Sequence, residues 1–225
     1  MTRSRLQDLI DLANEPSSEK RRELLREITD LFMDASGALG APQIALFDDV
    51  MSQLSVEMEE EVRVELAGRL ADADIAPDNL LKALSTDTIK VAEPILTRSK
   101  LLTEDHLVHV AQTMGQAHLR AVSKRASVPE RVSDEIVRRG DDTTLKVLLT
   151  NEGAKLSRAS CETVVDRAHA NNDLHAAVVD RRDLPADLLN EMYFVVEARL
   201  RAKIMERNAE LDPAVLEQAL TKGRR

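Results

Sequence analysis

Apolar residues recur at helical spacing from residue 77 onward, and they do so in nearly repeated blocks. Each block opens with a residue type that commonly starts a helix, and the openers are Pro77, Thr103, Pro129, Ser157, Pro185 and Pro213. Neighbouring openers are 26, 26, 28, 28 and 28 residues apart. Apolar residues follow each opener after three to four and after seven to eight positions, which places them on one face of an α-helix.

Each block predicts a second apolar helix after a short polar break. Turn-forming residues supply several of the breaks: Gly115, Gly140-Asp141-Asp142 and Asn171-Asn172-Asp173. The second helices end in basic or amide residues: Arg98, Arg125, Asn151, Arg181 and Arg207. Pro94 lies inside the first of them, where we expect a kink or a later helix start. A fixed period with two helices per unit is typical of an α-solenoid.

The amino-terminal third predicts four helices that precede this array. The first spans residues 4–14, the second runs from Ser17 or Ser18 to the region of Gly37 and Gly40, and Pro42 starts the third. Ser55 is expected to cap the fourth, whose first turns carry Glu57, Glu59, Glu60 and Glu61. We therefore assign residues 1–75 to a helical cap and a degenerate first repeat, and residues 76–225 to the repeat array.

The carboxyl-terminal residues predict an incomplete repeat. Pro213 opens another unit, and Leu216 and Leu220 fill the same apolar slots as in earlier blocks. Residues 222–225 are too polar to supply a second helix. We expect a half repeat whose apolar edge is covered by a further part of the natural chain or by another subunit, as in a homodimer.

Composition favours an all-α chain. Apolar residues make up 43% and aromatic residues 2%, with one tyrosine, Tyr193, in an expected core slot. The net charge is −9, and it is confined to residues 1–90, where 10 basic residues face 19 acidic ones. Residues 91–225 hold 21 of each. Nucleic-acid binders usually show a basic excess, which this chain lacks overall.

Few residues suggest chemistry. Cys161 is the single cysteine, which excludes an intramolecular disulfide, and its apolar slot predicts a small buried side chain. His106 and His109 could share a metal, but no third ligand is visible. The remaining histidines are expected to be exposed or half-buried: His118, His169 and His175. We interpret the Glu57–61 cluster and Asp48-Asp49 as solvated helix surfaces, and we expect no metal, no cofactor and no catalysis.

The recurring basic residues are the first candidate site. Arg98, Arg125, Arg181 and Arg207 recur at a similar phase and would form a ladder able to hold carboxylates or phosphates. The alternative is structural: each arginine caps its own helix or pairs with a neighbouring carboxylate. Further cations of the second helices would line a concave surface: Arg120, Lys124, Lys146, Arg199 and Lys203.

Several segments resemble a known bacterial family. They are Val91-Ala-Glu-Pro-Ile-Leu within residues 91–107, Leu148–Ser157, Asp180-Arg-Arg-Asp-Leu-Pro, Arg63-Val-Glu-Leu-Ala-Gly-Arg-Leu and Leu9-Ile-Asp-Leu-Ala. With these the chain resembles the family called domain of unknown function 2336 over most of its length. The resemblance implies an array of HEAT-like helical repeats, and it carries over no activity and no catalytic residue.

These observations favour a non-catalytic adaptor that binds a protein partner, of acidic character, on the surface of a HEAT-like solenoid. One alternative is a helical-repeat protein that binds or repairs DNA, although a stacking aromatic and a basic groove are not evident. Another is a purely structural homodimer. The amphipathic amino terminus and the lack of an apolar run of about 20 residues lead us to expect a cytoplasmic protein.

Overall fold

A computed structural model describes residues 18–210 of the chain. These residues are helical, with no strand among them and an isolated bridge between Val128 and Ala154. The chain forms two compact units, which join in the sequence between Val110 and Ala111. The predicted all-α class is confirmed, and the expected division at residues 75/76 stays a prediction. The helices predicted at residues 4–14 and after Pro213 lie outside the described residues.

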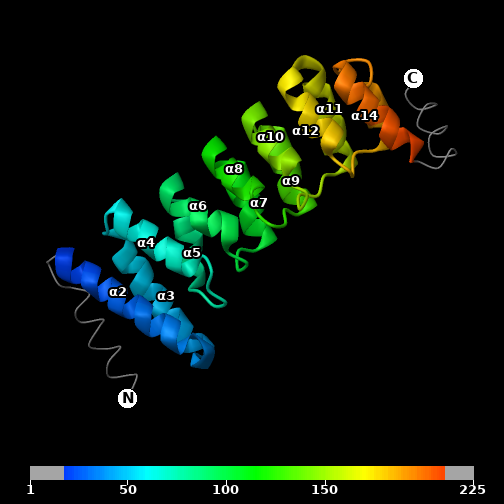
Figure 1. Ribbon diagram of the computed structural model, residues 1–225. Helices are drawn as coiled ribbons and strands as arrows, with labels where there is room; N and C mark the ends of the chain where they lie inside the picture. The colour runs from blue at the N-terminus through cyan, green and yellow to red at the C-terminus, as the bar shows by residue number, and fades with distance from the viewer. Residues whose placement is uncertain (1–17, 211–225) are drawn as a thin grey trace. The chain divides into compact units, whose positions relative to one another are not determined.

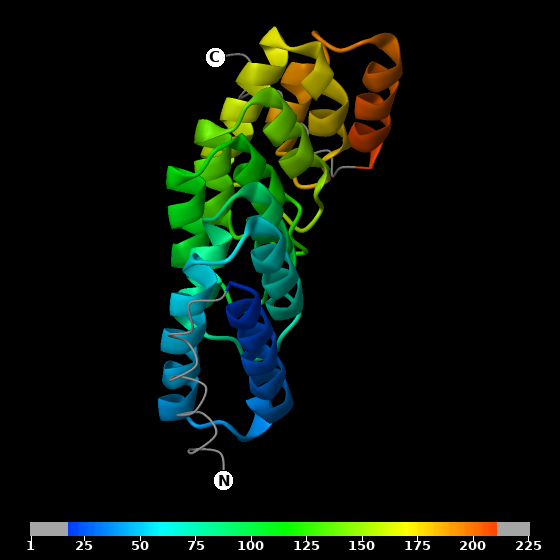
Figure 2. The ribbon, with the colours of Figure 1, turned by 90° about the vertical axis from the view of Figure 1, so that its left-hand side faces the viewer.

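The first unit is built of helices that pack in pairs. It contains α2 (Ser18–Ala35), the 3-10 turn η1 (Ser36–Ala38), α3 (Ala41–Val56), α4 (Glu60–Leu70), α5 (Asp78–Ser85), α6 (Ile89–Arg98) and most of α7 (Glu104–Thr113). α2 and α3 form an antiparallel pair (Figure 2), in which the rings of Phe32 and Phe47 meet edge to face at 5.2 Å. α3 packs against α5, and α4 against α6.

The second unit repeats one packing scheme. Its helices are α8 (Gln116–Ser123), α9 (Glu130–Arg139), α10 (Asp142–Thr150), α11 (Arg158–Ala170), the 3-10 turn η2 (Asn172–Leu174), α12 (His175–Asp180), α13 (Ala186–Met192) and α14 (Ala198–Ala209). Each helix contacts the one two further along the chain. Thus α9, α11 and α13 form a first-helix row, and α8, α10, α12 and α14 form a second-helix row (Figure 1).

The helix starts predicted at the openers are confirmed wherever the structure describes them. The openers lie directly before α5, α7, α9, α11 and α13: Pro77, Thr103, Pro129, Ser157 and Pro185. The Ser157 hydroxyl accepts the main-chain N–H of Ser160 at 3.1 Å, as an N-cap should. The apolar slots that follow the openers are buried, including those of Ile136, Val164 and Met192.

Two predicted boundaries are wrong. Ser55 does not cap α4, because it lies inside α3 with its hydroxyl donating to the Ser52 carbonyl at 2.9 Å. α4 instead begins at Glu60 after Glu59. α6 begins at Ile89, five residues before Pro94, so a later helix start is also wrong. The predicted turns at Gly115, Gly140 and Asn171 do lie between paired helices.

Candidate functional site

Arg181 lies just past α12 and binds the end of the preceding second-row helix. It is 5% exposed. Its guanidinium donates to the carbonyl oxygens of Ala154 at 2.7 Å and of Leu149 and Asn151 at 3.3 Å each. It also pairs with the Asp183 carboxylate at 2.6 and 2.8 Å. These are carbonyls at and beyond the carboxyl end of α10, which have no partner within that helix.

Asn151 and Arg207 make the same kind of contact at the ends of α8 and α12. The Asn151 amide donates to the carbonyl oxygens of Ser123 and Arg125 at 2.7 Å each, at the end of α8. Arg207 donates to the carbonyls of Val179 at 2.7 Å and Arg181 at 2.9 Å, at the end of α12. We call Asn151, Arg181 and Arg207 the clasp residues, because each joins the end of its own helix to the end of the previous one.

The clasp contacts favour a structural role for the recurring arginines over a ladder that binds carboxylates or phosphates. In the first unit, Arg98 of α6 likewise donates to the Gly68 carbonyl of α4 at 3.1 Å and pairs with Asp72 at 3.2 Å. Arg125 is half-buried, and burial lowers the pKa of its guanidinium. A planar fork that already holds main-chain oxygens has few donors left for a ligand. Asn151, which interrupts the arginine series, fulfils the same role with an amide.

The predicted cations of the second helices fall into two groups. Arg120 is half-buried and lies 3.4 Å from the Thr144 hydroxyl and 3.5 Å from Asp141. Lys124, Lys146, Arg199 and Lys203 are exposed. Lys203 pairs with Asp180 at 2.7 Å, which ties α14 to α12. Exposed ion pairs of this type contribute about 0–1 kcal/mol to stability, so the Lys203 side chain can leave Asp180 for a ligand at little cost.

The second-helix row carries two adjoining hollows. One, of ≈ 480 Å³, lies between α10 and α12 and is lined by Lys146, Thr150, Ala177 and Arg182 among others. The second, also ≈ 480 Å³, lies between α12 and α14 and is lined by Arg199, Lys203 and Glu206 among others. Ala176 and Asp180 line both. The two hollows therefore form one surface across three helices, which we call the α10–α14 groove.

The groove contains charges of both signs on an apolar floor. Leu149, Ala176 and Ala177 supply apolar area, and Lys146 and Arg199 stand at opposite ends, on α10 and α14. Each hollow falls in the size range of small-ligand and peptide pockets. The structure thus brings together Lys146, Arg199 and Lys203 among the predicted residues, and it assigns Arg181 and Arg207 to packing.

The histidine predictions are partly wrong. Of the three histidines expected to be exposed or half-buried, His118 and His175 are buried, at 8% and 4% exposure, and His169 is exposed. The His175 Nε2 lies 3.0 Å from the Ala168 carbonyl, which explains how its ring is accommodated. His106 lies with its Nε2 2.7 Å from the Ser85 hydroxyl, and burial lowers its pKa. Within residues 18–210, no group of three or more metal-binding side chains is placed to hold an ion.

Other candidate residues have simple environments. Cys161 is buried as predicted, and burial raises the pKa of its thiol. Tyr193 is half-buried, not a full core residue, because it lies at the end of α13 beside exposed Phe194. The acidic cluster before and in α4 is solvated but paired: Glu57 with Arg21, Glu59 with Arg22 and Glu60 with Lys90.

Sequence reasoning missed the role of Asp48. Its carboxylate is buried and accepts the main-chain N–H groups of Asn79 and Leu80 at 2.9 Å each. These are unpaired donors at the start of α5, so a side chain of α3 caps another helix. Asp48 therefore is not a solvated surface residue. Nothing in the local sequence distinguishes it from exposed Asp49.

Residues 18–210 are thus helical throughout, without a strand. The chain belongs to the family described as an uncharacterised protein conserved in bacteria (DUF2336), which it matches over residues 91–225. Comparison with curated proteins found no match, and neither did comparison with solved structures. In the described part of the chain, no helix has the length and apolar character needed to cross a membrane.

Proposed function

We propose that the chain is a non-catalytic adaptor, built as a solenoid of HEAT-like two-helix repeats, that binds a protein partner in the α10–α14 groove. The architectural part of the proposal is supported by the 26–28-residue spacing of the openers and by the two helix rows of the second unit. The clasp residues support it further, because they join equivalent positions of successive repeats.

The binding proposal depends on one observation: the two hollows are continuous. Ala176 and Asp180 of α12 line both, so an extended segment can contact α10, α12 and α14 in turn. Lys146 and Arg199 are exposed at the two ends, and within residues 18–210 neither has an ion pair. A partner segment with acidic residues near its ends and small apolar residues between them would complement this surface.

The test uses a photo-reactive residue in the groove. Ala176 is exposed and lines both hollows, so a benzophenone side chain at this position should crosslink to the partner in bacterial cells. Adding Lys146→Glu and Arg199→Glu should abolish the crosslinked product without lowering the melting temperature. The matched control is Lys100→Glu with Lys155→Glu, which makes the same charge change at exposed lysines that do not line the groove.

Equal crosslinking by the charge-reversed and control variants would refute the groove as the binding surface. A nucleic-acid partner gives a different result. A labelled DNA duplex would bind at low salt, lose affinity steeply as salt rises, and fail to bind the charge-reversed variant. That outcome would replace the protein partner by DNA.

A further inference from the structure

Among the described residues, Asp180 is the only charged one that lines both hollows of the α10–α14 groove. It is the last residue of α12, and its carboxylate pairs with the Lys203 ammonium group of α14 at 2.7 Å. The side chains of Asp180 and Lys203 are 54% and 47% exposed. An extended segment that runs from one hollow into the other therefore passes over this ion pair.

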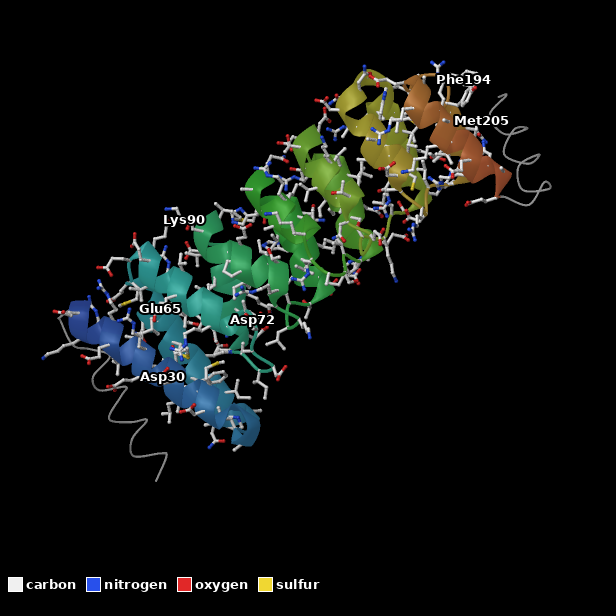
Figure 3. All side chains as sticks on the ribbon, viewed as in Figure 1. Asp30, Glu65, Asp72, Lys90, Phe194 and Met205 are labelled. Carbon is white, nitrogen blue, oxygen red and sulfur yellow. The ribbon has the colours of Figure 1, made fainter. Side chains whose placement is uncertain are left out.

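The charges that line the second hollow favour a cation beside Asp180. In the described part of the chain, three carboxylates line this hollow, those of Asp180, Glu197 and Glu206, against two cations, Arg199 and Lys203. Nitrogen and oxygen tips of side chains are intermixed over the helices of the second unit (Figure 3). A purely acidic segment would meet like charges at this end of the groove, which disfavours its binding.

The ion pair between Lys203 and Asp180 can open for a partner. An exposed pair adds little to stability, because holding a long side chain in one position offsets much of the attraction. An apolar segment laid over the closed pair would strip water from both charges, and their attraction would not recover that cost. A segment that supplies its own cation to Asp180 avoids the cost, since Lys203 can turn away into water.

We propose that Asp180 selects the partner: the segment that binds the groove carries one basic residue, which replaces Lys203 on Asp180. The inference rests on the proposed function, because it requires that the groove binds a protein segment. Arginine fits best, since its planar fork can bind both oxygens of a carboxylate at once. Acidic residues on either side of the arginine would reach Lys146 and Arg199 at the two ends of the groove. Lys203 is then an internal competitor, which holds Asp180 until such a segment binds.

Two substitutions with opposite expected effects test the proposal. Both are made in the full chain that carries the benzophenone side chain at Ala176, and the yield of crosslinked product is measured in bacterial cells at low expression. Asp180→Asn removes the charge and keeps the shape, so the yield should fall about ten-fold, as when one partner of an interfacial charge pair is lost. Lys203→Ala removes the competitor, so the yield should rise about three-fold, the modest change expected from breaking an exposed ion pair.

The controls make the same charge changes away from the groove. Asp173→Asn and Lys155→Ala replace exposed side chains that line neither hollow, and each should leave the yield within about two-fold of the unsubstituted chain. Melting temperatures show whether every variant keeps its fold. Asp180→Glu provides a further check, because it retains the carboxylate and should recover most of the yield that Asp180→Asn loses.

The reverse pattern would overturn the proposal. A segment whose acidic residues bind Lys203 itself would crosslink less in the Lys203→Ala variant and more in the Asp180→Asn variant. Unchanged yields in both variants would also overturn it, because the partner would then not touch the pair. Either result leaves the groove as the binding surface, provided that Lys146→Glu with Arg199→Glu still abolishes the product. If that charge reversal has no effect, the proposed function itself is refuted, and the selection by Asp180 with it.

Discussion

Removing the Arg181 side chain tests whether the clasps stabilise the fold. Arg181→Ala leaves the carbonyl groups of Leu149 and Ala154 without this donor, whereas the Asn151 carbonyl keeps the main-chain N–H of Ala154 at 3.2 Å. A buried acceptor without a partner costs about 1–3 kcal/mol. The bond to Ala154, at 2.7 Å, is the strong one, and the two at 3.3 Å are weak. The expected loss in the free energy of unfolding is therefore about 3 kcal/mol.

The Asp183 carboxylate adds little to this figure. Its side chain is 51% exposed, so water replaces the guanidinium when the arginine is removed. Exposed ion pairs contribute about 0–1 kcal/mol. Arg181→Lys keeps the charge but not the planar fork that reaches several oxygens at once, and it should lose most of the same stability.

Urea unfolding followed by circular dichroism measures the effect. At the usual dependence of the unfolding free energy on urea concentration, a loss of about 3 kcal/mol lowers the unfolding midpoint by about 1–2 M urea. Arg182→Ala is the control, because this neighbouring side chain is exposed and its change should stay within about 0.5 kcal/mol. Equal midpoints for the Arg181→Ala and Arg182→Ala variants would refute the reasoning, since they would mean that water satisfies the carbonyls of Leu149 and Ala154.

Three further predictions follow from buried groups. Asp48→Ala should cost about 1–2 kcal/mol in urea unfolding, because the start of α5 loses its cap, whereas Asp49→Ala should be neutral. The Arg158 guanidinium, through its hydrogen bonds and its charge, lowers the pKa of the Asp187 carboxyl below its usual value. That stabilisation is complete above the unfolded pKa and is lost as pH falls through the lower folded value, so Asp187→Asn should flatten the acid unfolding curve there. Buried Cys161, whose pKa is raised, should react slowly with Ellman's reagent until urea unfolds the chain; rapid reaction in the folded state would contradict its placement.

The helix starts were predictable because their signals are local. Pro129, Ser157 and Pro185 stand directly before α9, α11 and α13, as the opener pattern required. A capping hydroxyl or a proline acts on main-chain groups within one turn, so a single sequence shows it. The prediction at Ser55 was wrong because it used the same local signal alone. The residue type of Ser55 fits a cap, but α3 continues past it to Val56, and Ser55 lies on the buried face of that helix next to Leu54.

Features that depend on distant partners could not be predicted. The donors that Asp48 accepts lie 31 and 32 residues further along the chain. The recurring position of Arg181 and Arg207 was visible in the sequence, but the carbonyls that they bind lie at the ends of other helices, 27 and 28 residues earlier in the chain. The buried rings of His118 and His175 likewise depend on neighbouring helices. The α10–α14 groove was expected as a basic surface, and packing brought Asp180 and Glu206 into it as well.

The clasps limit how the length of such a chain can change in evolution. Arg207 binds carbonyls 28 and 26 residues earlier, and Asn151 does the same. Duplication or loss of an entire repeat preserves these distances along the chain. An insertion of one residue within a second-row helix turns the clasp side chain by about 100° and withdraws it from its acceptors. Relatives should therefore differ by complete repeats or by loop insertions between helices, and seldom by one or two residues within the second-helix row.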